Sequence, residues 1–429
     1  MNIYSKNKHF IFLSSYLFIL IVLLFISYLI FGGNVNTFSP LAISDVVLYK
    51  NISDKIILGW IPYTNFHFEY PPLSALFFVL PRIFTSNFIV YMYIFSIISL
   101  LTAYFCIFIS YKILKLYYQK FDFKRIFLYC LIFILLYLIL IIFRYDIYSA
   151  FFTALGIFLY LLSYKIKNKT YHLLSYIVIV LGGLLKLYPF LILPIFFISD
   201  LKQNNLKAFF KTVIYGCVLI ILNFYFIICA IPGILFFLKF HSGRGIHIES
   251  FYSSIILFLY NNGIISDVSV VHNFCSLNLS GHIPILLSRL YPYIFFIIYC
   301  SFIFFVFKRI NWSKNLPKNI IFSSTIVILI FVLFNKVFSP QYLLWLFPMI
   351  FMLDVFNNKK YTISFIFLIA TFLSVLIFPI YYEALVSLNY LIVLVLLIRN
   401  VLLLVILIMM IKSLFINQEK IDKLDEVNI

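Results

Sequence analysis

The sequence predicts an all-α polytopic membrane protein, with about twelve transmembrane helices and a long first outer loop that carries interfacial helices. Hydrophobic residues make up 65% of the 429 residues and charged residues only 11%. Soluble domains have about 45–50% apolar and about 25% charged residues, so this composition excludes a soluble globular protein. Each helix needs about 20 apolar residues to cross the bilayer, which leaves room for little else. We therefore expect one transmembrane domain over residues 1–412 and a short, disordered cytoplasmic tail over 413–429.

Long apolar runs separated by short polar stretches predict the positions of the helices. Several runs are too short to cross a bilayer alone, which predicts broken segments buried against their neighbours. Segment 73–84 could be a further span, but counting it would invert every later loop, so we expect an interfacial or re-entrant helix there. The expected helices are 10–31, 88–111, 126–143, 147–164, 173–186, 188–199, 209–231, 284–307, 319–334, 341–353, 362–380 and 387–411.

The positive charge is arranged as a membrane topology requires. The formal net charge of +18 could indicate a nucleic-acid partner. However, Lys and Arg form short clusters between apolar runs, as the positive-inside rule predicts for cytoplasmic loops. The sequence therefore predicts a multi-pass protein of the plasma membrane, with both termini in the cytoplasm, in contact with membrane lipids and not with nucleic acid. The clusters lie at 112–125, 165–169, 202–211, 308–318 and 359–360.

Two long outer loops, 32–72 and about 232–283, hold much of the polar chemistry. An outer carboxylate could act as a general base, because it can take the proton of a hydroxyl within hydrogen-bond reach. Asp45 stands in the apolar-flanked run LAISDVVLY, which could pack as an amphipathic helix on the bilayer. Asp45 is thus either a candidate base or the N-cap of that helix. The outer acids are Asp45, Asp54, Glu69, Asp146, Glu249, Asp267 and Glu383.

Three further charges lie at the outer ends of apolar runs. Inserting an ionisable group at the middle of a transmembrane span costs about 2.5–3.5 kcal/mol, so such a residue is expected to have a partner or a function. Asp146, in FRYDIYSAFF, either pairs with neighbouring Arg144 or lines the site. Lys186 and Lys336 each lie beside a proline-bent segment. They either extend to the interface or hold an anionic headgroup with an ammonium.

The run 240–250 brings Arg, His and Glu together between two glycines. Arg244 could bind a phosphate through its fork of donors, and His247 could hydrogen-bond the same group. The alternatives are a metal site built from His241, His247 and Glu249, or salt bridges within a surface loop. Arg399, in LLIRNVLL, is expected to pair inside the helix bundle. The six cysteines show no metal or redox spacing.

At these residues the chain resembles glycosyltransferase family 87, a branch of the C-type superfamily of polytopic membrane enzymes. The motifs are weak singly, but their order is fairly specific and extends over residues of about 10 to 350. The resemblance rests on Asp45, Gly59, Tyr63, Tyr70-Pro71-Pro72-Leu73, Arg144-Tyr145-Asp146-Ile147-Tyr148, Lys186-Leu187-Tyr188-Pro189, Arg244-Gly245-Ile246-His247-Ile248-Glu249-Ser250 and Lys336-Val337-Phe338-Ser339-Pro340-Gln341-Tyr342.

The resemblance implies an inverting transfer of a sugar, mannose in most family members, from a polyprenyl-phosphate donor to a lipid or glycan acceptor. Asp45 would deprotonate the acceptor hydroxyl. The charge that grows on the leaving phosphate would be stabilised by four groups. The resemblance implies no metal and no cofactor. The implied phosphate-binding residues are Lys186, Arg244, His247 and Lys336, and further candidates for substrate binding are Asp146, Glu69, Tyr70, Glu249, Gln341 and Tyr342.

Two other classes of protein share parts of this pattern. A lipid or polyprenyl-glycan flippase would use similar basic pockets, but it predicts inverted repeats and polar residues at both faces. No repeat is visible in the sequence. A glycan polymerase or ligase acting on lipid-pyrophosphate oligosaccharides would share the topology. The donor that is consumed would separate these classes.

Overall fold

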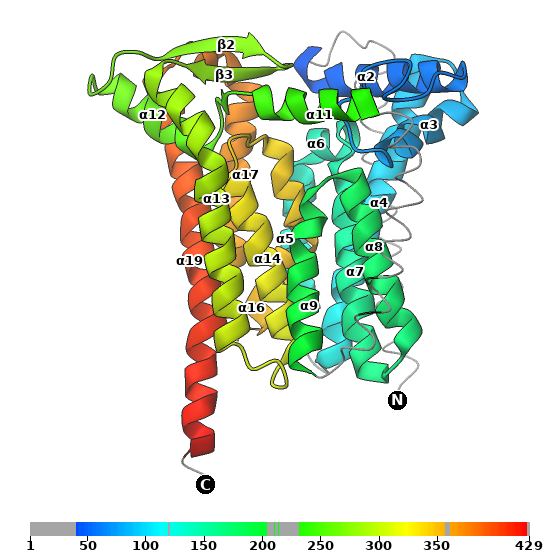
Figure 1. Ribbon diagram of the computed structural model, residues 1–429, viewed down its shortest axis with the longest axis vertical. Helices are drawn as coiled ribbons and strands as arrows, with labels where there is room; N and C mark the ends of the chain where they lie inside the picture. The colour runs from blue at the N-terminus through cyan, green and yellow to red at the C-terminus, as the bar shows by residue number, and fades with distance from the viewer. Residues whose placement is uncertain are drawn as a thin grey trace.

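The computed structural model describes residues 40–118, 121–203, 210, 213, 231–356 and 361–426. The structure is a bundle of long helices with a layer of shorter elements, here called the cap, across one end (Figure 1). The bundle contains α4 (Phe88–Tyr117), α7 (Asp146–Ile166), α8 (Lys169–Leu185), α13 (His282–Arg309), α14 (Leu316–Phe334), α17 (Thr362–Val375) and α19 (Tyr390–Glu426). The cap contains α2 (Pro40–Ile57), α3 (Ser74–Phe84), α11 (Ile231–Gly243), α12 (Phe251–Asn261) and a small sheet.

Six helices among the described residues are long and apolar enough to cross a membrane, by length and composition. This confirms that the protein is mostly helical and has helices of membrane-spanning length. The expected total of about twelve transmembrane helices stays a prediction. The expected helices at 10–31 and 209–231 lie almost entirely outside the described residues. The six are Phe88–Tyr117, Asp146–Ile166, His282–Arg309, Leu316–Phe334, Thr362–Ile380 and Tyr390–Phe415.

Several expected spans are interrupted, as their shortness predicted. Proline accompanies these interruptions except the one between α5 and α6, because it fixes φ and removes an N–H, so that it begins a new helical segment better than it continues an old one. Pro189 and Pro340 stand at the start of 3-10 turns, and Pro348 begins a short helix. The interrupted segments are α5 (Phe123–Leu136) with α6 (Leu138–Phe143), η2 (Tyr188–Ile192) with α9 (Leu193–Lys202), η3 (Pro340–Trp345) with α15 (Phe347–Ile350) and α16 (Leu353–Phe356), and, after α17, η4 (Leu376–Ile380) with α18 (Tyr382–Val386).

Segment 73–84 is the 11-residue helix α3, which lies in the cap (Figure 1). It is too short to cross a bilayer, in agreement with the interfacial helix expected there. Its start is fixed to the bundle, because the Leu73 N–H donates to the Leu184 carbonyl at 3.0 Å. Asn87 then caps α4 by accepting from the N–H groups of Ile89 and Val90, as N-cap residues do.

The second long loop, at about 232–283, contains two helices and a small sheet within a protein that is otherwise mostly helical. It contains α11, α12 and three antiparallel strands in the order β1-β3-β2, with β1 at Ile246–His247, β2 at Ser269–Asn273 and β3 at Ser276–Ser280. Phe274 and Cys275 form the turn between β2 and β3 with φ of 48° and 54°. Two positive φ values are the geometry that a tight two-residue hairpin needs.

Two of the expected cation clusters, as far as the structure describes them, lie at the end of the bundle opposite the cap. α7 and α8 form a hairpin whose turn, near the lower edge of Figure 1, carries the exposed Lys165, Lys167 and Lys169. α13 ends at the same level with Lys308 and Arg309. α19 continues in the same direction as far as Glu426, so the disordered tail expected from 413 is wrong over 413–426.

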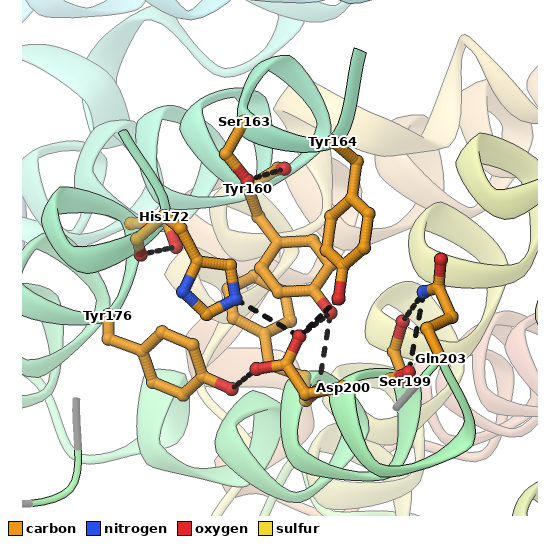
Figure 2. A network of polar contacts seen from close by, with 10 residues as sticks. Tyr160, Ser163, Tyr164, His172, Tyr176, Ser199, Asp200 and Gln203 are labelled. Carbon is orange, nitrogen blue, oxygen red and sulfur yellow. Dashed lines mark hydrogen bonds and ion pairs between the residues drawn. The ribbon is translucent and has the colours of Figure 1, made fainter. Parts of the chain in front are cut away.

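A buried carboxylate fastens α9 to the α7–α8 hairpin (Figure 2). The Asp200 side chain is fully buried. Its Oδ1 accepts from the hydroxyls of Tyr160 at 2.7 Å and Tyr164 at 2.5 Å and lies 3.0 Å from Nε2 of His172. Its Oδ2 accepts from Tyr176 at 2.7 Å. Both oxygens are thus occupied by side chains of the protein, which indicates a structural role.

Candidate active site

A cavity of about 760 Å³ lies where the cap meets the bundle. Its wall takes residues from α2, from the loop before α3, from η2 and η3, and from the strand and loop segments at 244–249 and 272–277. The outer acids Asp54, Asp267 and Glu383, which were also candidates for a general base, do not line this cavity. Every site residue that the family resemblance implied does line it. They are Asp45, Glu69, Tyr70, Asp146, Lys186, Arg244, His247, Glu249, Lys336, Gln341 and Tyr342.

Asp45 lies in the interior of α2, so its alternative interpretation as an N-cap is wrong. The helix buries one face, because Val46 and Tyr49 pack into the core, and leaves the Asp45 side chain 29% exposed at the cavity. The carboxylate forms an ion pair with Arg144, whose guanidinium is almost buried. Burial lowers the pKa of Arg144 to about 10, and the guanidinium remains charged at neutral pH.

Asp146 pairs with Lys186 and not with its sequence neighbour Arg144. Oδ1 of Asp146 lies 2.9 Å from Nζ of Lys186 and accepts from Nε1 of Trp345 at 2.8 Å. The ammonium also lies 4.5 Å from the ring centre of Tyr145 and 5.7 Å from that of Tyr342. Burial lowers the pKa of Lys186, and the charge of Asp146 opposes that shift. Lys186 is therefore a cation fixed in the cavity wall by Asp146 and the neighbouring aromatic rings, and its side chain does not extend freely to the interface.

Arg244 is incompletely satisfied. Its Nη2 lies 3.8 Å from Oε2 of Glu69, and its guanidinium lies 4.9 Å from the ring centre of Phe240. Within the described part of the chain its buried Nε has no hydrogen-bond partner. A buried donor without an acceptor is costly, so an anion in the cavity would stabilise it. Burial raises the pKa of Glu69, while Arg244 opposes that shift.

Lys336 has carbonyl partners but no carboxylate partner among the described residues. Its Nζ donates to the carbonyls of Ser242 at 2.7 Å and Arg244 at 2.6 Å, and it lies 5.0 Å from the ring centre of Tyr291. Burial lowers its pKa to about 8, and the charge of Arg244 adds to that shift. Among the described residues, Lys336 is thus a cation of the cavity that no carboxylate neutralises.

His247 does not fit the expected contact with a phosphate. Its Nδ1 accepts from the N–H of Glu249 at 3.3 Å, and a hydrogen bond with the backbone of Phe338 occupies the ring further. Burial lowers its pKa to about 4, so the ring is neutral at pH 7. We correct its expected role to that of a structural residue of the 244–250 segment.

Glu249 is also committed to the protein. Its Oε2 lies 3.2 Å from Nη1 of Arg399, and both side chains are buried. Arg399 therefore pairs inside the bundle as the sequence predicted. His241 meets the carbonyl of Glu69 at 3.1 Å. No three His, Cys, Asp or Glu side chains gather as metal ligands within the described ranges, so the metal alternative at His241, His247 and Glu249 has no support.

Sequence reasoning did not identify three further lining residues, Arg144, Cys275 and Tyr382, as parts of the site. Arg144 stands two residues from Asp146, which suggested a local pair and hid its contact with α2. Cys275 is in the turn between β2 and β3. The sequence signal for that hairpin was the polar and apolar pattern of Ser269–Asn273, which is too short to predict a strand on its own.

One side of the cavity wall is apolar and reaches the surface. Phe295 and Phe296 of α13 line it together with Leu187. Leu187 is 51% exposed and Phe296 is 64% exposed. Since α13 is also one of the membrane-like helices, this rim gives an apolar route from the cavity to the outside of the bundle.

Comparison with known proteins adds no assignment, because no protein-family model and no curated protein matches the chain.

Proposed function

We propose that this protein is an integral membrane glycosyltransferase that moves a sugar from a polyprenyl-phosphate donor to a lipid or glycan acceptor. The observation that carries the proposal is the single cavity in which Asp45 shares a wall with Lys186, Arg244 and Lys336 beside an apolar rim. A phosphate-linked sugar on a long apolar chain needs cations for its phosphate, a base beside its sugar and an apolar route for its chain. The cavity offers all three.

The reaction proposed is an inverting displacement. Asp45 takes the proton of an acceptor hydroxyl, whose oxygen forms the new bond to the anomeric carbon. The bond from that carbon to the phosphate oxygen breaks, and its electron pair leaves with the polyprenyl phosphate. Arg244 and Lys336 stabilise the charge on the departing oxygens, because preorganised cations in a site of low dielectric act most strongly where charge develops. Asp146 holds Lys186 in the wall between these groups.

The charge distribution supports the orientation that we propose. The described lysines and arginines of the clusters at 165–169 and 308–318 occupy the end opposite the cap, and by the positive-inside rule that end faces the cytoplasm. The cap and its cavity then face outward in the plasma membrane, and α19 ends inside. Mannose is proposed as the sugar because the chain resembles family 87 in its sequence motifs and most members of that family transfer mannose.

The donor class can be tested directly. Purified protein in liposomes is given radiolabelled polyprenyl-phosphate mannose, or sugar nucleotides, or polyprenyl-pyrophosphate oligosaccharide, together with a total lipid acceptor extract. We expect label to pass to the acceptor from the first donor only. Movement of the labelled donor between leaflets without transfer would support the flippase, and consumption of the third donor would support the polymerase or ligase.

A matched pair of variants tests the base. Asp45 and Asp54 are both on α2, are 29% and 31% exposed, and are both paired with an arginine. Only Asp45 lines the cavity. We expect Asp45→Asn to lower kcat by about 10²–10⁴-fold, the usual contribution of a general base, and Asp54→Asn to leave it unchanged. Full activity of Asp45→Asn would remove the mechanism.

A further inference from the structure

A fully buried arginine in the last long helix contacts both segments that supply the outer cations. Arg399, on α19, is 0% exposed. Its guanidinium pairs with the carboxylate of Glu249 at 3.2 Å, and its Nη2 donates to the Glu249 carbonyl at 2.5 Å. It also lies 4.1 Å from the ring centre of Phe338. A charged side chain buried in a membrane-spanning helix is costly and rare, so its presence suggests a functional role.

The two segments touched by Arg399 are the ones that carry Arg244 and Lys336. Glu249 belongs to the 244–250 segment, and Phe338 lies two residues after Lys336. The segments are also joined to each other. The His247 N–H donates to the Lys336 carbonyl at 2.9 Å, and the Lys336 ammonium donates to the Arg244 carbonyl at 2.6 Å.

Arg399 itself does not line the cavity, whereas Glu249, Arg244 and Lys336 do. Any effect of Arg399 on a ligand must therefore pass through the residues it holds. The neighbouring Asn400 strengthens the same connection, because it accepts from Nε of Arg399 at 3.1 Å and donates to the Ser250 carbonyl at 3.3 Å.

We propose that Arg399 is a positioning residue, which sets the spacing of Arg244 and Lys336 by clamping the 244–250 and 336–342 segments to α19. This inference rests on the proposed function, since it deepens the account of how the donor phosphate is held. A guanidinium suits the task because its planar fork contacts the carboxylate, the carbonyl and the aromatic ring at once, which a single ammonium cannot do.

The alternative is that the pair only stabilises the fold. Buried ion pairs are weak evidence for stability, and exchanging both partners for apolar or neutral groups is often tolerated. The two roles therefore separate in a variant that removes both charges. A merely structural pair changes the amount of folded protein, while a positioning residue changes affinity for the phosphate in the protein that does fold.

The test measures phosphate affinity apart from turnover. Binding of polyprenyl phosphate to purified wild type, Arg399→Lys and the double variant Glu249→Gln/Arg399→Met is followed by microscale thermophoresis, beside KM, kcat and the melting temperature. We expect Kd and KM for the donor to rise about 10- to 100-fold in the double variant, as when a supporting partner of a binding residue is removed. Arg399→Lys keeps the positive charge, and we expect its Kd and KM to lie between those of the double variant and those of wild type.

Asp200→Asn is the control for stability loss alone. Asp200 is buried at the other end of the bundle and is absent from the cavity wall, so this variant is expected to melt earlier with Kd and KM unchanged. Double-variant Kd and KM within twofold of wild type would overturn the positioning role. Failure of the wild type to bind or use polyprenyl phosphate would instead overturn the proposed function, so the two failures are distinguishable.

Discussion

Replacing Lys336 by methionine is the sharpest test of the proposed phosphate site. The change keeps an unbranched apolar side chain but removes an ammonium that no acid compensates among the described residues. Its Nζ already donates to two carbonyls at 2.6 and 2.7 Å, which leaves its remaining N–H for a ligand. A hydrogen bond to a charged group contributes about 1.5–3 kcal/mol, or about 10- to 150-fold in an equilibrium constant.

We therefore expect the KM for the polyprenyl-phosphate donor to rise by about 10- to 150-fold in Lys336→Met. The upper end applies if Arg244, whose carbonyl loses its donor, also moves. The assay is the initial rate of sugar transfer as a function of donor concentration with purified protein. Lys318→Met is the matched control, because Lys318 is 5% exposed and Lys336 is 3% exposed, and Lys318 lies in the first turn of α14 whereas Lys336 follows the end of that helix by two residues. An unchanged KM in Lys336→Met, or an equal rise in Lys318→Met, would refute the reasoning.

Three further predictions follow from the described contacts. Because Lys336 has a pKa of about 8 and binds an anion only when protonated, donor affinity should fall as pH rises through about 8; a KM profile from acid to alkaline pH should show this, and Lys336→Arg should abolish the fall. Cys275 lines the cavity and is exposed, so polyprenyl phosphate should slow its alkylation by N-ethylmaleimide; Cys275→Ser identifies the protected label, and an unaltered rate would place the ligand elsewhere. Asp200→Asn removes a buried carboxylate that several donors share, at a cost of about 3 kcal/mol or more; thermal unfolding should occur at lower temperature, and an unshifted transition would contradict the structural role.

The sequence predicted the membrane-like helices well, because apolar runs of span length have few alternative explanations. It also predicted which residues share a site. Each of Asp146, Lys186 and Lys336 is an ionisable residue at the end of an apolar run, where burial is expensive, and such residues gather where polar partners exist. That argument needs no knowledge of contacts. Other predicted members of the cavity wall, such as Gln341 and Tyr342, were implied by the resemblance to family 87 and not by the cost of burial.

Pairing within the site could not be read from the chain. Arg144 and Asp146 are close in sequence, but their side chains meet partners from α2 and from the end of α8. The role of His247 failed for a similar reason, since only the folded backbone reveals that Glu249 and Phe338 occupy its ring. The small sheet was missed because strands of two and five residues carry too short a pattern to compete with a loop.

The surplus charge of Lys336 bears on the end of the catalytic cycle as well as its start. In the proposed transfer a phosphodiester with one negative charge becomes a phosphomonoester, whose charge at pH 7 is about −1.5 to −2. The same ammonium and the same unfilled guanidinium donor then meet a more strongly charged group than the one they received. If the protein carries out the proposed transfer, we therefore expect release of the polyprenyl phosphate, and not the displacement at the anomeric carbon, to limit turnover, and we expect free polyprenyl phosphate to be a potent competitive inhibitor.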